Sequence, residues 1–226
     1  SINKNGSAIV NLNGTVNLIG TSKSNKSLFY NNTATNGGAI YNEGKMNITL
    51  NTFGANATKK AVFTNSATNG GAIYNLQDDI GAESNLVINS STFIDNLATN
   101  GGAIYNKYAN APASNPVVVN AKFYRNDTTS NGEGGAIYNE GYLEAFKSDF
   151  GQSGKSAQIN TAYNGGAVAN KNGAIYDSSA SNYYMNTATK KGGAIYNESS
   201  VASVDDETGE ITYNESIVHI DGGNFT

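Results

Sequence analysis

Apolar and polar positions alternate over short segments of the chain, and no stretch has apolar residues at helical spacing. Short alternations bounded by Asn, Gly, Ser or Thr are typical of β-strands. A glycine-led segment, an aliphatic alternation and an aromatic segment follow one another repeatedly, so we expect three short strands in each period and almost no helix. The aliphatic alternations are Val16 and Leu18, Met46 and Ile48, Leu86 and Ile88, and Val117 and Val119.

The glycine-led segment is a repeated phrase. GGAIYN begins at residues 37, 70, 101, 134 and 192, with the variants GSAIVN at 6 and GGAVAN at 165. The steps between starts are 31, 33, 31, 33, 31 and 27 residues, and a regular period of this size indicates stacked structural repeats. Within most periods an aromatic residue is followed shortly by Asn: Phe29 to Asn32, Phe63 to Asn65, Phe93 to Asn96, Phe123 to Asn126 and Tyr183 to Asn186.

These repeats predict an all-β fold, a parallel β-helix in which each period forms one coil. We expect about seven coils of roughly 31–33 residues in one solenoid domain that covers residues 1–226. At an inter-strand spacing of about 4.8 Å, the rod would be on the order of 34 Å long. A propeller would need four antiparallel strands in each repeat, and leucine-rich repeats would need a leucine framework that this sequence lacks.

Stacking accounts for the residue types in the phrase. A constant aliphatic residue at the fourth position predicts an inward column, and a constant closing Asn predicts a ladder of amide hydrogen bonds at a turn. The paired glycines fit a tight corner before the strand. The fourth-position residues are Ile9, Ile40, Ile73, Ile104, Ile137, Val168 and Ile195. The closing residues are Asn11, Asn42, Asn75, Asn106, Asn139, Asn170 and Asn197.

Composition narrows the function classes. The chain has 36 Asn and 26 Gly, charged residues make up 14 %, and the net charge is −4. That charge and the single Arg125 argue against nucleic-acid binding, which needs a basic surface. No apolar run approaches the length of a membrane span. Without cysteine, disulfide frameworks and thiolate metal sites are excluded. Low charge with abundant Asn, Thr and Ser suits an extracellular or cell-surface location.

The motifs resemble a known family of repeats. GGAIYN alternating with FYNN, FIDN and FYRN is similar to the paired GGA-aliphatic and FxxN repeats of chlamydial polymorphic membrane proteins, and to passenger segments of autotransporter-like and adhesin-like surface proteins. The resemblance implies a right-handed parallel β-helix of the pectin-lyase-like type on a microbial surface, often with an adhesive role. Two departures are the sequence FGQS at 150–153 in place of FxxN and the acidic insertion VDDETGE at 204–210.

Catalysis is not expected, because the carboxylates are mostly single and fall at turn positions. Enzymes that cleave polysaccharides need paired carboxylates on adjacent coils. Two acidic groups are read as solvated loop tips or, alternatively, as weak calcium sites. His219 is read as an outward strand residue without a Ser or Asp partner, and we expect no cofactor. The acidic groups are Asp78, Asp79 and Glu83, and Asp205, Asp206, Glu207 and Glu210.

The fifth position of the phrase is the candidate binding surface. If the aliphatic residue points inward, strand alternation turns this position outward. The result would be a tyrosine column for sugars or a protein partner, or else a stack of rings that only stabilises an exposed sheet. The column comprises Tyr41, Tyr74, Tyr105, Tyr138 and Tyr196, with Val10 and Ala169 at the remaining positions.

The two ends of the chain lie in the same phase of the repeat, so that FT followed by SINKNGSAIV reproduces the spacing of FTNSATNGGAIY at 63–74. This predicts a subunit that stacks head to tail into a filament, or a module excised from a longer array. The other function class is an adhesive module that presents the tyrosine face or the loops at 76–84 and 107–115. The expected self-assembly residues are Ser7, Ile9, Asn11, Gly192, Ile195, Asn197 and Phe225.

Overall fold

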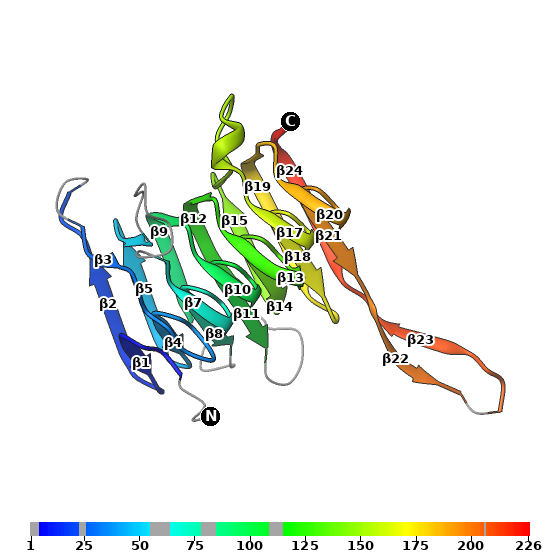
Figure 1. Cartoon of the computed structure of the whole chain (residues 1–226). Helices are drawn as coiled ribbons and strands as arrows, with labels where there is room; N and C mark the ends of the chain where they lie inside the picture. Colours follow the sequence, from blue (N-terminus) through cyan, green and yellow to red (C-terminus); the bar gives the residue numbers. More distant parts are fainter. Residues whose placement is uncertain (1–4, 23–25, 55–63, 78–84, 109–114, 206) are drawn as a thin grey trace.

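The chain is a parallel β-solenoid in which three sheets wind around one core (Figure 1). The computed structural model describes residues 5–22, 26–54, 64–77, 85–108, 115–205 and 207–226. Within these residues the only helical element is a single 3-10 turn, η1 (Ser156–Gln158). The all-β parallel solenoid predicted from the repeats is confirmed.

The phrases form a seven-stranded sheet, here called the phrase sheet. Each strand pairs in parallel with the next, and the fourth-position residues lie side by side, as in Ile40 beside Ile73 and Ile104 beside Ile137. The predicted parallel, in-register pairing is therefore confirmed for all seven phrases. The strands are β1 (Ile9–Asn11), β4 (Ile40–Asn42), β8 (Ile73–Gln77), β11 (Ile104–Tyr108), β14 (Ile137–Glu140), β18 (Val168–Lys171) and β21 (Ile195–Glu198).

The aliphatic alternation and the aromatic segment lie in one sheet, the long sheet. In four rungs they form one continuous strand, and in two of the others a residue with positive φ lies between them: Leu50 (φ 57) and Lys147 (φ 49). The sequence-based division into two separate strands is thus only partly right. The members are β2 (Thr15–Ile19), β3 (Leu28–Phe29), β5 (Lys45–Thr49), β6 (Thr52–Phe53), β9 (Leu86–Ile94), β12 (Val117–Tyr124), β15 (Tyr142–Phe146), β16 (Asp149–Phe150), β19 (Ile175–Tyr183) and β24 (Ile217–Phe225).

A third sheet follows the Asn of the aromatic motif, where the sequence analysis expected no strand. Its segments are short and polar, so they carry no apolar alternation. Because this sheet has five strands against seven in the phrase sheet, the number of complete turns is nearer five than the expected seven. Its strands are β7 (Ser66–Asn69), β10 (Leu97–Asn100), β13 (Asp127–Glu133), β17 (Thr161–Asn164) and β20 (Thr187–Lys191).

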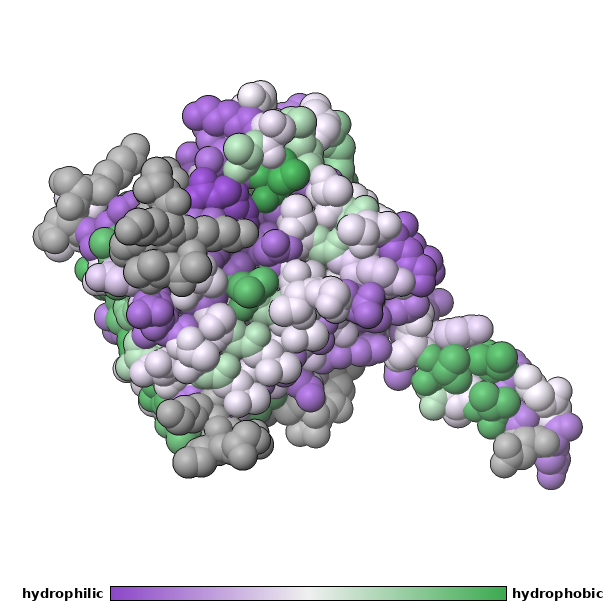
Figure 2. Space-filling model, viewed as in Figure 1, coloured by the Kyte–Doolittle hydropathy of each residue, from purple (hydrophilic) through white to green (hydrophobic). Residues whose placement is uncertain are grey.

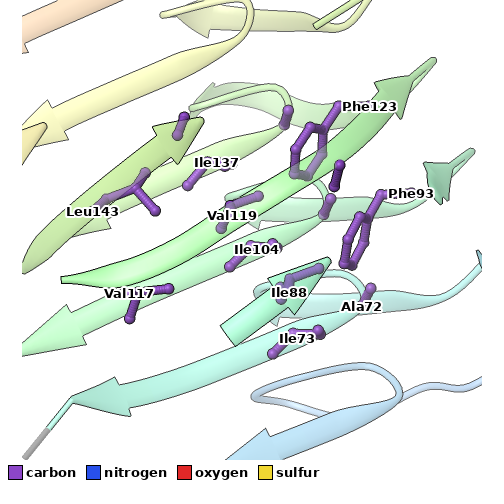
Figure 3. Close-up of a cluster of buried hydrophobic side chains, with 14 of the residues drawn as sticks. Ala72, Ile73, Ile88, Phe93, Ile104, Val117, Val119, Phe123, Ile137 and Leu143 are labelled. Carbon is purple, nitrogen blue, oxygen red and sulfur yellow. The ribbon is translucent and has the colours of Figure 1, made fainter. Parts of the chain in front are cut away.

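The core is built from columns of like side chains. Ile73, Ile104 and Ile137 are fully buried and point toward the aliphatic residues of the long sheet, as Figure 3 shows. Gly102 makes the corner before β11 possible, since a Cβ there would lie 2.2 Å from the carbonyl oxygen of Gly135. Burial of these columns supplies most of the stabilisation, at roughly 25 cal/mol for each Å² of apolar surface.

The aromatic column is continuous, with ring centroids 4.5–5.0 Å apart. Phe53 supplies the second ring, and Phe63, which the sequence analysis chose, lies outside the described residues. Phe150 stacks between its neighbours although its motif had looked degraded. In both periods an insertion separates the ring from the Asn that follows it. The column is Phe29, Phe53, Phe93, Phe123, Phe150, Tyr183 and Phe225.

The predicted asparagine ladder is present at the end of the phrase strands. Each amide nitrogen, from Asn11 to Asn170, donates to the amide oxygen one rung further on, over 2.7–2.9 Å. A second ladder, over 2.8–3.0 Å, joins the residues that close the aromatic motif: Asn32, Asn65, Asn96, Asn126, Asn160 and Asn186. Both ladders satisfy polar groups that would otherwise be costly to bury.

One element leaves the solenoid. The antiparallel hairpin formed by β22 (Ser200–Val204) and β23 (Ile211–Asn214) projects from the last rung as an arm (Figure 1). It contains part of the acidic insertion noted in the sequence. A two-stranded hairpin is marginal in water by itself, so the arm is the part of the fold with the least support from packing.

Candidate interaction surfaces

The tyrosine column lies on the outer side of the phrase sheet, as the alternation predicted. Tyr41, Tyr74, Tyr105 and Tyr138 form a cluster separate from the core, with ring centroids 4.8–5.2 Å apart and planes within 5–27° of each other. Each side chain is only 7–9 % exposed, because the neighbouring rings cover its faces. The expectation of an exposed tyrosine face is therefore wrong for these four residues. The inner rings of the stack have no free face for a sugar.

The phenol groups are held neutral against carboxylates. Tyr41 donates to Glu43 and Tyr105 donates to Glu140. Burial, together with the charge of Glu140, raises the pKa of Tyr74 to about 12 and also raises the pKa of Tyr105 and Tyr138. The column is thus a stabilising stack of protonated phenols at neutral pH.

The stack is interrupted at the sixth rung, where Ala169 replaces Tyr. There the Nζ atom of Lys171 lies 2.7 Å from Glu133, 2.8 Å from Glu198 and 5.7 Å from the ring centroid of Tyr196. Burial acts against the charge of this amine, but the two carboxylates outweigh it and raise the pKa of Lys171. A charged cluster therefore takes the place of a ring contact.

The expected self-assembly residues lie at the two ends of the solenoid. Strand β1 is one edge of the phrase sheet and β21 is the other. Ser7, Gly192 and Asn197 are exposed. Ile9 and Ile195 are partly buried against the core, while Asn11 is buried in its ladder. Phe225 stacks on Tyr183 at 4.5 Å and remains 48 % exposed.

The arm has one apolar and one polar face. Val201 pairs with Tyr213 and Val204 with Ile211, and an irregularity at Ala202 keeps both pairs on the same side. These four side chains are 47–55 % exposed, and Figure 2 shows apolar surface on the arm. The opposite face carries the hydrogen-bonded hydroxyls of Ser203 and Thr212.

His219 points outward as expected, but it does have an acidic partner. Its Nδ1 lies 2.8 Å from Asp177 Oδ1, one rung away, and Tyr142 donates to the other oxygen of that carboxylate over 2.8 Å. The 42-residue separation conceals this contact in the sequence. Only the strand register, with Ile175 beside Ile217, reveals it.

The acidic loops hold no recognisable metal centre within the described residues. Asp205 accepts backbone hydrogen bonds from Glu207 and Thr208 in the turn at the tip of the arm, and these bonds lower its pKa. Asp206 lies outside the described residues, as do Asp78, Asp79 and Glu83. Most of the two proposed binding loops falls there too, at residues 78–84 and 109–114.

Comparison with known proteins agrees with this architecture. The Chlamydia polymorphic membrane protein (Chlamydia_PMP) repeat matches residues 26–43, 90–107 and 186–198. Each match covers one or both halves of the repeated motif pair. The suspected resemblance is therefore confirmed, and the chain is a parallel β-solenoid that carries repeats of this type.

Neither the curated proteins nor the solved structures contain a significant match. In the part of the chain that the structure describes, no helix has the length and apolar character needed to cross a membrane.

Proposed function

We propose that the chain is a non-enzymatic structural solenoid at the cell surface, whose rungs continue from one subunit to the next in a head-to-tail filament. The match to polymorphic membrane protein repeats supports the surface location. The observation that carries the filament is that the inward aliphatic column, the first asparagine ladder and the aromatic column continue into both end rungs.

The end rungs are where stacking would release free energy. Inward residues of the middle rungs, such as Ile73 and Ile104, are 0 % exposed, whereas Ile9 and Ile195 are only partly buried. The edge strands β1 and β21 also have backbone groups without a neighbouring strand in the phrase sheet. A further rung would bury the apolar side chains and pair the backbone, and open edges of this kind favour association.

At the proposed junction, the two edge strands of the phrase sheet would meet. The segment Ser7–Asn11 of one subunit would pair with Gly192–Asn197 of the next, and Asn197 would continue its ladder into Asn11. Phe225 would present its uncovered ring face to the aromatic column of the neighbour, next to Phe29. Because such a contact uses two different surfaces, it does not close on itself and gives a fibre.

Light scattering and electron microscopy over a concentration series test this proposal. Wild-type protein should form fibres as the concentration rises. Ile9→Lys and Phe225→Asp should leave the subunit folded but monomeric, because each places a charge in the junction. Lys107→Asp, an exposed change in a middle rung, is the control and should still assemble. Wild-type protein that stays monomeric at high concentration would overturn the filament.

Adhesion is the second candidate, and the arm is the observation that favours it. Its apolar face is exposed, while the inner tyrosine rings are covered by each other. Val201→Ser with Tyr213→Ser would remove half of that face at little cost to the solenoid, since the arm is an appendage. Adhesion through the arm predicts weaker attachment of protein-coated beads to cells with this variant than with wild type. Equal attachment would contradict it.

A further inference from the structure

Two adjoining hollows on the long sheet form one groove, which the repeat pattern of the sequence does not predict. They have volumes of about 420 and 450 Å³ and share Lys26 and Thr92 in their walls. The walls draw on residues in or near β3, β6, β9, β12 and β16, so the groove crosses five rungs. Four inter-strand steps span about 19 Å. The groove therefore runs along the rod and is open to an extended polymer.

The groove is basic although the chain is acidic overall. Lys26, Lys122, Lys147 and Lys155 line it, and none of the other described lining residues is Asp or Glu. Outside the lining, Asp149 lies 3.9 Å from the Lys122 amine, whose side chain is 57 % exposed. Concentrating four lysines of a chain with net charge −4 in one groove creates a local positive potential. The ligand it selects is an anion.

The remaining lining identifies the kind of anion. Ser90, Asn120, Gln152 and Gln158 place hydroxyl and amide groups between the lysines. Such groups exchange hydrogen bonds with sugar hydroxyls, while ammonium groups pair with carboxylates or sulfates.

Apolar contact comes from the partly exposed Leu28 and from Tyr124. A single-stranded nucleic acid would need several aromatic platforms for its bases, and Tyr124 is the one ring among the lining residues that the structure describes. The net charge also disfavours nucleic acid.

We propose that this groove binds an acidic polysaccharide, with Lys122 and Lys147 pairing with its charged groups. Lys26 and Leu28 lie in the first rung of the long sheet, but Lys122 and Lys147 lie in the fourth and fifth rungs, away from both ends, and no lining residue lies in β1 or β21. Binding would attach the rod sideways to a glycan-coated surface and leave both ends open. It therefore extends the proposed function and does not depend on it.

The test uses immobilised heparin oligosaccharide, with neutral dextran and double-stranded DNA as comparison ligands. Wild type should bind heparin in a salt-dependent manner and should not bind dextran. Lys122→Gln with Lys147→Gln should weaken heparin binding on the order of tenfold, from the loss of two solvent-exposed ion pairs. Lys107→Gln with Lys190→Gln, two exposed lysines outside the groove, is the matched control and should bind as wild type does.

The same melting temperature for both double variants ensures that binding and not folding is measured. Absence of heparin binding, equal losses in the two double variants, or equally tight binding of DNA would each overturn the assignment. Filament formation is scored on the same samples by light scattering. A loss of fibres with retained heparin binding would count against the filament alone.

Discussion

Ile104→Asp probes the inward column at the centre of the solenoid. Ile104 lies in β11, is 0 % exposed and stacks between Ile73 and Ile137. Truncating a fully buried Ile costs about 2–5 kcal/mol from lost burial and the cavity left behind. An unpaired carboxylate at the same place adds several kcal/mol, whether it stays charged or is protonated and lacks a partner. The sum is comparable to the total stability of a typical domain, about 5–15 kcal/mol.

Circular dichroism during urea unfolding measures the loss, and limited proteolysis locates it. Because each rung contacts only its neighbours, the variant should open at the fourth rung and yield fragments from either side of β11, or unfold completely. Ile104→Val should cost only about 0.5–1.5 kcal/mol. Lys107→Asp places the same charge on an exposed position of the same strand, opposite Glu140, and should cost no more than about 1 kcal/mol. An Ile104→Asp protein that unfolds at the parent's urea concentration would refute the inward assignment.

Three further outcomes are expected. Burial raises the pKa of Tyr74 from 10.0 to about 12, so the stability that its protonated phenol contributes is complete below pH 10 and is lost as pH rises toward 12, by about 1.4 kcal/mol per pH unit. The urea midpoint of unfolding should therefore fall across this range, and less steeply in Tyr74→Phe. Midpoints that do not change with pH would contradict the buried phenols. Arg125→Met removes the ion-pair partner of Asp95, which is fully buried and lies 2.8 Å from the Arg125 guanidinium. The variant should lose about 3–5 kcal/mol of unfolding free energy, and adding Asp95→Asn should recover much of it. An unchanged melting curve for the single variant would show that the pair is not needed. Asn106→Leu breaks the ladder in the middle of the stack and removes the oxygen that accepts a hydrogen bond from the Asn75 amide. The unfolding free energy should therefore drop by about 1–3 kcal/mol. A variant as stable as the wild type would mean that the ladder is dispensable.

The parts of the fold that were predictable are those in which one residue type recurs at constant spacing. Ile104 and Asn106 have counterparts in every period, and stacking identical side chains explains why. The third sheet was missed because segments such as Ser66–Asn69 have no apolar alternation. Their strands are held by backbone pairing between rungs and by the second Asn ladder. Phe53 was missed because an insertion lies between it and Asn65.

The interaction surfaces depend on three-dimensional neighbours that the sequence does not reveal. Alternation gave the outward direction of Tyr105, but its ring faces are covered because rungs lie about 4.8 Å apart, which leaves no room for a ligand between stacked rings. Lys122 and Lys147 meet in one groove because β12 and β16 are neighbouring strands, with Lys122 beside Asp149. No repeated motif marks either residue.

The central claim is that successive periods stack in parallel and in register, and a single distance tests it most directly. Asn47 and His219 are joined by five successive strand pairings through Val87, Val118, Glu144 and Asp177, all on the outer side of the long sheet. Because the chain has no cysteine, spin labels on Asn47→Cys and His219→Cys report on this pair alone. Pulsed electron paramagnetic resonance should give one narrow distribution near about 24 Å, five inter-strand spacings. A broad distribution, or a distance far from this value, would contradict the stacked solenoid.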